Sequence, residues 1–296
     1  MVNRRHGVRI FPLLAGLAWC SGAWAQPRTF IADIEQSLWR LTSDSAVECR
    51  LEHPIPGFGT GAFVSRASKN INLVFELNPL RALPRTQSAA LRSESPHWQP
   101  GRGARDLTRV TFYQQFDAMV EQQSAWIMLD ELSQGRWPTF YFDDWYRNNQ
   151  ATGVGLSSVN FRARYAAFLD CQHNLLPYGF EDIAFSVLTY VNNADELTPH
   201  SRQRLSMIAE YVKADPGINE VVINTYTDSF GTEYHNKQLS RRRAEAIKEH
   251  FMALGLPEGA VSLEGHGERR PIADNSTPEG RDLNRRVVIS LGRERL

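Results

Sequence analysis

Hydrophobic and polar residues alternate with period two in two stretches near the start of the chain, residues 63–67 and 71–77. Glycine and proline residues typical of turns accompany these stretches, so the pattern predicts β-hairpins. Residues 78–106 are rich in proline, serine, arginine and glycine, and we expect a long exposed loop there. We therefore predict that residues 26–176 form a β-rich domain.

The pattern changes near the run Asn-Leu-Leu-Pro at residues 174–177, which is a plausible domain boundary. Beyond it, strand-like and helix-like segments alternate. Thr198, followed by a proline, marks the start of a helix, and the Asp-Pro-Gly run at residues 215–217 marks its end. The apolar residues 221–223 then predict a buried strand.

A second helix is expected to begin with Ser240 as its N-cap and to end at Gly255, since glycine is favoured just after a helix. Short strands are predicted around residues 261–263 and 286–291. The resulting order β-α-β-α-β-β predicts a two-layer α/β sandwich for residues 177–296. The whole chain is thus expected to be α+β, with a β-rich domain followed by this sandwich.

Residues 1–25 have the features of a secretory signal peptide. Arginines stand near the start, an apolar run covers residues 10–20, and a small-x-small cleavage site ends at Ala25. A lipid anchor on Cys20 is disfavoured, because the bulky Trp19 precedes that cysteine. We therefore expect export to the periplasm and removal of residues 1–25.

The charge balance is even, with 33 Lys and Arg residues against 33 Asp and Glu residues. Loss of the signal segment removes three arginines and no acid, which leaves the mature chain a formal net charge of −3. This balance argues against a nucleic-acid binder that works by neutralising phosphates. No apolar stretch after the signal segment reaches the length of about 18 residues that a membrane span needs. We expect no transmembrane segment in the mature chain.

Two cysteines, Cys49 and Cys171, remain in the mature chain. An even pair in an oxidising compartment favours a disulfide bond, which would join the start of the first domain to its end. Two free buried thiols are the alternative. The wide spacing of the two cysteines excludes a Cys-x-x-Cys redox or zinc motif.

Motifs for catalysis or cofactor binding do not occur in the sequence. It contains no Gly-x-Ser-x-Gly nucleophile elbow, no phosphate-binding loop and no His-Glu-x-x-His pair. The eight histidines do not stand at metal-ligand spacing from one another or from cysteine. We therefore predict a binding protein rather than an enzyme, with no metal and no cofactor.

Asp228 and Arg243 are the residues with the clearest chemistry. Asp228 follows a predicted strand, and Arg243 is expected in the first turn of the next helix, both at exposed ends of their elements. Together they can hold a zwitterion, because the carboxylate accepts from an ammonium group and the guanidinium binds a carboxylate through two hydrogen bonds. The alternative is that the two side chains pair only with each other.

The sequence around these residues resembles the OmpA-like peptidoglycan-binding domain. The resemblance covers roughly residues 177–296 and consists of the runs T-D-x-x-G, N-x-x-L-S-x-x-R-A, G-x-G-E-x-x-P and N-x-T-x-x-G-R-x-x-N-R-R-V. It implies that Asp228 and Arg243 grip the diaminopimelate of the peptidoglycan stem peptide. Asn236 is expected to reach the same cleft, and Arg286 is expected to support its wall.

The sequence departs from this family in two places. Thr225 and Tyr226 stand where the family usually has Gly-His, and Tyr190 and Val191 stand where its first strand commonly has Phe-Asp. The missing aspartate removes one contact with the peptide. Binding is therefore expected to be weaker, or to need a partner first.

A further set of segments resembles the MotY family, periplasmic components of the polar flagellar motor. The segments are residues 54–59, 65–69, 72–77, 123–126, 135–140 and 180–185. With them the resemblance covers nearly the whole mature chain. It implies a protein of the ring around the flagellar basal body that helps to hold stator units. The N-terminal half would dock on the motor, and the C-terminal half would attach to the cell wall.

Two other functions stay open from the sequence. A general envelope tether, in the manner of other OmpA-like proteins, would bind peptidoglycan without a flagellar role. Such a tether would carry a membrane anchor, and we predict none for this sequence. A wall-modifying enzyme with a binding module would need a catalytic centre within residues 26–176. No nucleophile or metal pattern occurs in that segment.

Overall fold

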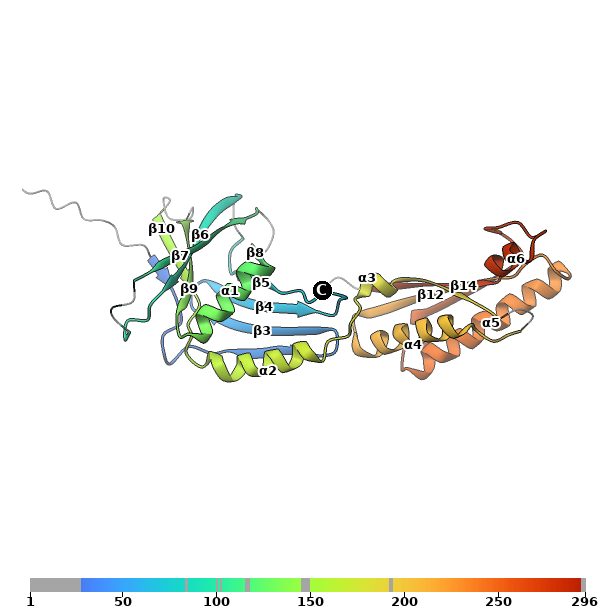
Figure 1. Ribbon diagram of the computed structural model, residues 1–296, viewed down its shortest axis with the longest axis horizontal. Helices are drawn as coiled ribbons and strands as arrows, with labels where there is room; N and C mark the ends of the chain where they lie inside the picture. Colours follow the sequence, from blue (N-terminus) through green and yellow to red (C-terminus); the bar gives the residue numbers. More distant parts are fainter. Residues whose placement is uncertain are drawn as a thin grey trace, which may run out of the picture.

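The structure is a computed structural model that describes residues 28–293 except 83–84, 100, 102, 115–117, 145–149 and 192–193. The predicted signal segment, residues 1–25, lies outside the described residues. The molecule is elongated, and two lobes follow one another along its long axis (Figure 1). Each lobe has its own hydrophobic core. We call residues 28–173 the N-terminal lobe and residues 180–293 the C-terminal lobe.

The described part of the N-terminal lobe contains two five-stranded sheets and two helices. The elements are β1 (Arg28–Phe30), β2 (Arg40–Asp44), β3 (Glu48–Ile55), β4 (Gly59–Arg66), β5 (Val74–Pro79), β6 (Gln87–Glu94), β7 (Arg105–Phe112), β8 (Ala118–Glu121), α1 (Gln122–Ser133), β9 (Trp137–Asp144), β10 (Gln150–Gly155) and α2 (Phe161–His173). One sheet has the order β1-β10-β9-β6-β7, and the other has the order β2-β3-β4-β5-β8.

The two sheets share one core, because large aromatic side chains from both point into it. The ring centres of Phe63 in β4 and Phe75 in β5 lie 4.9 Å apart, and Phe75 lies 5.7 Å from Phe140 of the other sheet. The stretches with period-two alternation fall largely in β4 and β5, which pair as antiparallel neighbours. The β-rich character and the hairpin expected there are confirmed.

The prediction of a long exposed loop at residues 78–106 is wrong. Strand β6 lies inside this range and pairs with both β7 and β9. Its inward side chains, Ala89, Leu91 and Ser93, are fully buried. Since two of these three residues are small, the segment lacks the strong apolar alternation by which a buried strand is recognised in a sequence.

The C-terminal lobe is a two-layer sandwich, as predicted. Its elements are α3 (Phe180–Ile183), β11 (Phe185–Thr189), α4 (Pro199–Ala214), β12 (Ile218–Tyr226), α5 (Glu233–Ala253), the 3₁₀ turn η2 (Glu258–Ala260), β13 (Val261–Gly267), α6 (Pro278–Asn284) and β14 (Arg286–Arg293). The sheet has the order β11-β14-β12-β13. Helices α4 and α5 lie along the same face of it (Figure 1).

The helix boundaries were predicted with mixed success. Helix α4 begins where expected, with the Thr198 hydroxyl accepting from the Ser201 amide at 3.2 Å. Helix α5 begins eight residues earlier than predicted, because its N-cap is Thr232 rather than Ser240, and the Thr232 hydroxyl accepts from the His235 amide at 3.2 Å. The polar first two turns of α5 carry little apolar periodicity, which hid them. The short helix α6 was not predicted.

The two lobes meet at a seam where side chains of the first lobe enter the core of the second. Val47, in the turn between β2 and β3, and Ala67, just after β4, are both buried in the C-terminal core. The amide of Leu176 donates to the carbonyl of Ala46 at 2.8 Å. Lys69 forms a 2.5 Å ion pair with Asp182 at the same seam. The connecting segment is therefore packed rather than a free linker.

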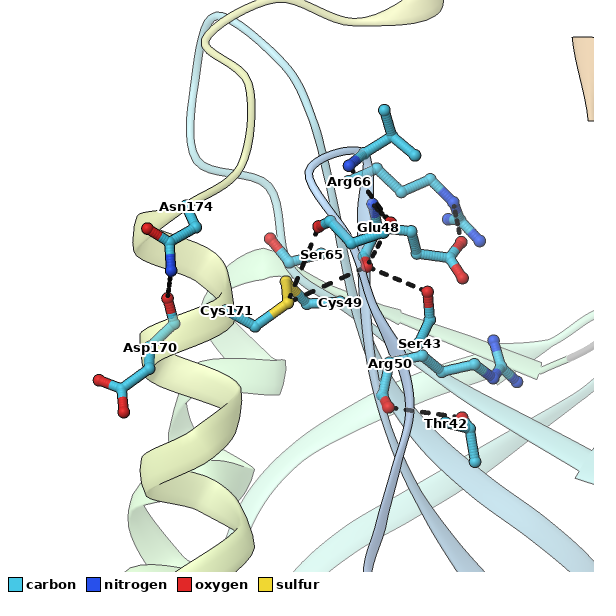
Figure 2. The surroundings of a disulfide bond; sticks show 12 residues. Thr42, Ser43, Glu48, Cys49, Arg50, Ser65, Arg66, Asp170, Cys171 and Asn174 are labelled. Carbon is cyan, nitrogen blue, oxygen red and sulfur yellow. Dashed lines mark hydrogen bonds and ion pairs between the residues drawn. A yellow bond between two sulfur atoms is a disulfide. The ribbon is translucent and has the colours of Figure 1, made fainter. Parts of the chain in front are cut away.

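The predicted disulfide bond between Cys49 and Cys171 is present and joins β3 to α2. Figure 2 shows the sulfur atoms between the helix and the strand, with the Cα atoms 5.9 Å apart. Both cysteines are buried, and 122 positions separate them in the sequence. The bond fixes the last helix of the N-terminal lobe against its first long strand, next to the seam.

A buried histidine joins three segments of the N-terminal lobe. The ring of His53 is fully buried and stacks on Trp39, with ring centres 4.5 Å apart. Its Nδ1 lies 2.9 Å from the Leu38 carbonyl, and its Nε2 accepts from the Ser157 amide at 3.3 Å. The neutral tautomer that carries its proton on Nδ1 satisfies both contacts. A protonated ring would place the N–H of Nε2 against the amide N–H of Ser157. Burial lowers the pKa of His53 to about 4.

Acid should therefore destabilise the N-terminal lobe in a defined pH window. Between the unfolded pKa of about 6.5 and the folded pKa of about 4, the unfolded chain binds a proton that the folded chain excludes. The free energy of unfolding should be highest above this window and fall by roughly 3 kcal/mol as the pH drops through it. Urea unfolding followed by tryptophan fluorescence measures this. The free energy of unfolding should depend less steeply on pH in His53→Gln than in wild type. An unchanged pH dependence in that variant would assign the acid sensitivity to other groups.

Loss of the disulfide bond should be costly, because it closes a loop of more than a hundred residues. Chain-entropy arithmetic gives about 4–5 kcal/mol for such a loop, less any strain. We expect Cys171→Ser to lower the free energy of unfolding by about this amount in urea titrations. Equal stability of the reduced and oxidised wild-type protein would contradict the prediction.

Candidate functional site

The carboxylate of Asp228 is buried at the end of the central strand β12. Its Oδ2 accepts from Nη1 of Arg285 at 2.5 Å, and its Oδ1 accepts from the Phe230 amide at 3.0 Å. The second bond is a local turn typical of aspartate, and it fixes the loop between β12 and α5. The negative charge of Asp228 is therefore already balanced by a cation that comes from just after α6.

Asn236 ties this loop to the next one. Its side chain is buried in the first turn of α5. Its amide nitrogen donates to the carbonyl of Asp228 at 3.3 Å and to Oε2 of Glu268 at 2.8 Å. Asp228 and Asn236 thus lie together, as the sequence predicted, with Glu268 as a second carboxylate beside them.

Arg243 does not lie in the first turn of its helix, as we expected, but about three turns into α5. Its guanidinium lies 4.0 Å over the ring of Tyr190. Its Nε donates to Oδ1 of Asp195 at 3.0 Å, and its Nη2 donates to the Ala194 carbonyl at 3.0 Å. Its Nη1 is buried and has no hydrogen-bond partner among the described residues.

The charge partner of Arg243 is much more exposed than Arg243 itself. The Arg243 side chain is 7% exposed, whereas that of Asp195 is 68% exposed. An ion pair with one partner in water contributes little to stability. Asp195 is therefore the member of the pair that another carboxylate can replace, while Arg243 is fixed by its helix and by Tyr190.

Arg286 begins the last strand, as predicted, and lies 3.9 Å over the ring of Tyr226. Tyr226 in turn stacks on His266, with ring centres 4.7 Å apart. The Nη2 of Arg286 donates to the Arg270 carbonyl at 3.2 Å. Burial is the main reason that the pKa of Arg286 lies below its usual value. The three stacked side chains form a rigid layer at the ends of β12, β13 and β14.

The alternative that Asp228 and Arg243 pair only with each other is excluded, because each has a different partner of opposite charge. The expectation that both lie at exposed element ends is wrong, because both side chains are buried. Burial is possible since each charge is balanced locally, which is the condition for a buried charge.

Sequence reasoning missed the partners Arg285, Asp195 and Glu268. Arg285 and Asp228 stand 57 positions apart, and only the folding of the lobe brings them together. One signal was available for Arg285, which stands beside Arg286 in the matching run N-R-R-V. Glu268 is likewise the acidic residue of the matching run G-x-G-E-x-x-P, whereas no sequence pattern marked Asp195.

The described residues hold no group of three or more His, Cys, Asp and Glu side chains that could bind a metal ion. Within the same residues, no helix is both long and apolar enough to cross a membrane.

Comparison with known proteins finds relatives of both lobes. The family described as MotY N-terminal domain matches residues 30–177, and the OmpA family matches residues 189–285. The sodium-type flagellar protein MotY of Vibrio parahaemolyticus is 48% identical over 266 residues, which cover 90% of this chain and 91% of that protein. The outer-membrane lipoprotein YfiB of Pseudomonas aeruginosa is 40% identical over 111 residues, 38% of this chain and 66% of its own length.

Among solved structures, the C-terminal domain of Helicobacter pylori MotB is similar to part of this chain. It is 22% identical, with a TM-score of 0.32, and the match covers 37% of this chain and 85% of that one.

Removal of the cation beside Asp228 should destabilise the C-terminal lobe. Arg285→Leu leaves a buried carboxylate without its ion-pair partner, which typically costs about 3–5 kcal/mol. Arg269→Leu is the matched control, because Arg269 forms an exposed pair with Glu233 and such pairs contribute about 0–1 kcal/mol. Urea unfolding of both variants measures the difference. Equal effects of the two substitutions would show that burial does not set the strength of the Asp228–Arg285 pair.

Proposed function

The chain belongs to the MotY family of flagellar proteins, and from this we propose that it is a periplasmic motor component that binds peptidoglycan non-covalently and helps to hold stator units around the basal body. The flagellar role follows from the family, which matches half of the chain, and from the relative that spans nearly all of it. The match of residues 189–285 to the OmpA family supports the wall-binding part of the proposal. The proposal includes no catalytic step.

We further propose a division of labour along the chain. Residues 1–25 direct export and are removed, residues 26–176 dock on the motor, and residues 177–296 bind the wall. The separate hydrophobic cores of the two lobes support this division. Helix α6, which directly precedes Arg285, lies at the end of the molecule remote from the N-terminal lobe (Figure 1). A wall ligand can approach that end without meeting the motor.

The observation that carries the wall-binding proposal is the state of Arg243. A buried guanidinium whose Nη1 has no partner among the described residues, and whose carboxylate partner is exposed, is suited to exchange that partner for a ligand carboxylate. The free carboxylate of diaminopimelate is such a ligand. Asp228 would accept from its ammonium group, since a carboxylate offers more acceptor positions than Arg285 and Phe230 occupy.

A general envelope tether without a flagellar role is less well supported. OmpA-family domains alone would fit it, but the N-terminal lobe matches a family of flagellar proteins. A wall-modifying enzyme would need a catalytic centre in the N-terminal lobe, and the buried His53 of that lobe is fully engaged with backbone atoms.

Site variants should lose peptidoglycan binding. We expect Asp228→Asn and Arg243→Lys to weaken binding by roughly 10- to 150-fold, the equivalent of a charged hydrogen bond of about 1.5–3 kcal/mol. Lysine fails at position 243 because an ammonium group cannot give the planar two-pronged bond. These conservative variants are preferred to alanine, because both positions are buried. A pull-down with purified peptidoglycan measures binding, and circular dichroism confirms the fold.

Arg242→Lys is the control for that experiment, because Arg242 is the exposed neighbour of Arg243 on the same helix. It should bind like wild type. Wild-type binding by Asp228→Asn and Arg243→Lys as well would move the wall-binding site elsewhere.

The C-terminal part should act alone. We expect a fragment that begins near Tyr178 to fold and bind peptidoglycan, but not to localise to the flagellum. It should be less stable than the full chain, because it lacks Val47 and Ala67, which complete its core. Fluorescence microscopy of the tagged fragment tests localisation. Basal-body localisation of the fragment would overturn the division of labour.

A further inference from the structure

Two aromatic rings beside the candidate site are almost fully exposed. Phe230 is 82% exposed and Tyr234 is 76% exposed, more than any other Phe, Tyr or Trp in the described part of the chain. The core of the C-terminal lobe is complete without them. Rings held in water in this way gain by covering an apolar surface, and aromatic residues are enriched at binding interfaces for that reason.

The backbone that carries these rings is fixed to the site. The amide of Phe230 donates to Asp228 at 3.0 Å, and Tyr234 lies in the first turn of α5. Between them Gly231 turns the chain with a φ of +104°, a conformation that side chains other than glycine rarely adopt.

The neighbouring loop contacts the same segment. The Ser229 amide donates to Oδ1 of Asn275 at 3.3 Å. The two rings are therefore presented by an anchored turn.

We propose that Phe230 and Tyr234 form a platform for a sugar ring of the glycan strand that bears the stem peptide. This inference rests on the proposed binding of the stem peptide at Asp228. The flat face of a hexose presents C–H groups, which carry partial positive charge and stack on the negative face of an aromatic ring.

The reach of the ligand fits this placement. Two stem residues separate diaminopimelate from the muramic acid that carries the stem, a span of about 7 Å in an extended chain. The amide of Phe230 lies 3.0 Å from Oδ1 of Asp228, so the exposed ring at this position stands within a side chain's length of the carboxylate.

A carboxylate stands beside the two rings. Glu233 lies between them in sequence, and its exposed carboxylate pairs with Arg269. An acidic side chain in this position is less suited to an anionic lipid surface than to a neutral sugar.

Two soluble ligands separate the platform from the peptide site. One is the free stem peptide that ends in diaminopimelate, and the other is the same peptide on its GlcNAc–MurNAc disaccharide. Wild-type mature protein should bind the disaccharide-peptide more tightly by calorimetry. The double variant of Phe230→Ala and Tyr234→Ala should lose affinity for the disaccharide-peptide, on the order of tenfold, and keep its affinity for the free peptide.

Two further variants serve as controls. Phe230→Trp should keep the preference for the disaccharide-peptide, because it retains an aromatic face. Leu283→Ala removes an exposed aliphatic side chain from α6 and should change neither affinity. Asp228→Asn should weaken both ligands alike.

Equal wild-type affinity for the two ligands would overturn the platform and leave the proposed function intact. The same conclusion would follow if the double variant lost both ligands to the same degree. Binding of the wild type, but not of the double variant, to vesicles of anionic phospholipid would assign the rings to a membrane and overturn the proposal. If the wild type bound neither ligand, the proposed peptide site itself would fall, and the platform with it.

Discussion

The packing of Val47 and Ala67 into the C-terminal core is the contact on which the arrangement of the molecule depends. Val47 directly precedes β3, which the Cys49–Cys171 bond holds against α2, and Ala67 directly follows β4, the strand that pairs with β3. The disulfide bond joins α2 to β3, and the seam joins the adjacent residues to the C-terminal core. Together they connect the two lobes without a flexible linker. A protein proposed to attach to a motor at one end and to the wall at the other would transmit force through this connection.

The chemistry at the far end of the molecule follows from how its charges are balanced. Asp228 is paired with Arg285, whose side chain is 12% exposed, and Arg243 is paired with an exposed aspartate, Asp195. The first pair stabilises the fold of the loops. The second has a weakly held member, and it leaves one buried N–H group of Arg243 without a partner among the described residues. The Asp228–Arg285 part of the site is thus rigid. At the other part, a ligand carboxylate can take the place of Asp195 beside Arg243.

The sequence predicted those features that depend on local pattern. The strands β4 and β5, the cap Thr198 and the cysteine pair were all found from spacing or composition. Strand β6 was missed because its inward residues are small, and the start of α5 was missed because its first turns are polar. The ion-pair partners of Asp228 and Arg243 could not be predicted, because residues distant in sequence supply them.

The central claim is that wall attachment through Arg243 is what the motor needs from the C-terminal lobe. Swimming in soft agar by a deletion strain that produces the Arg243→Lys protein tests it most directly, with Arg242→Lys as the control. The account predicts that Arg243→Lys protein is exported, folded and present at the basal body, but that the cells do not swim. Normal swimming with that protein would contradict the account.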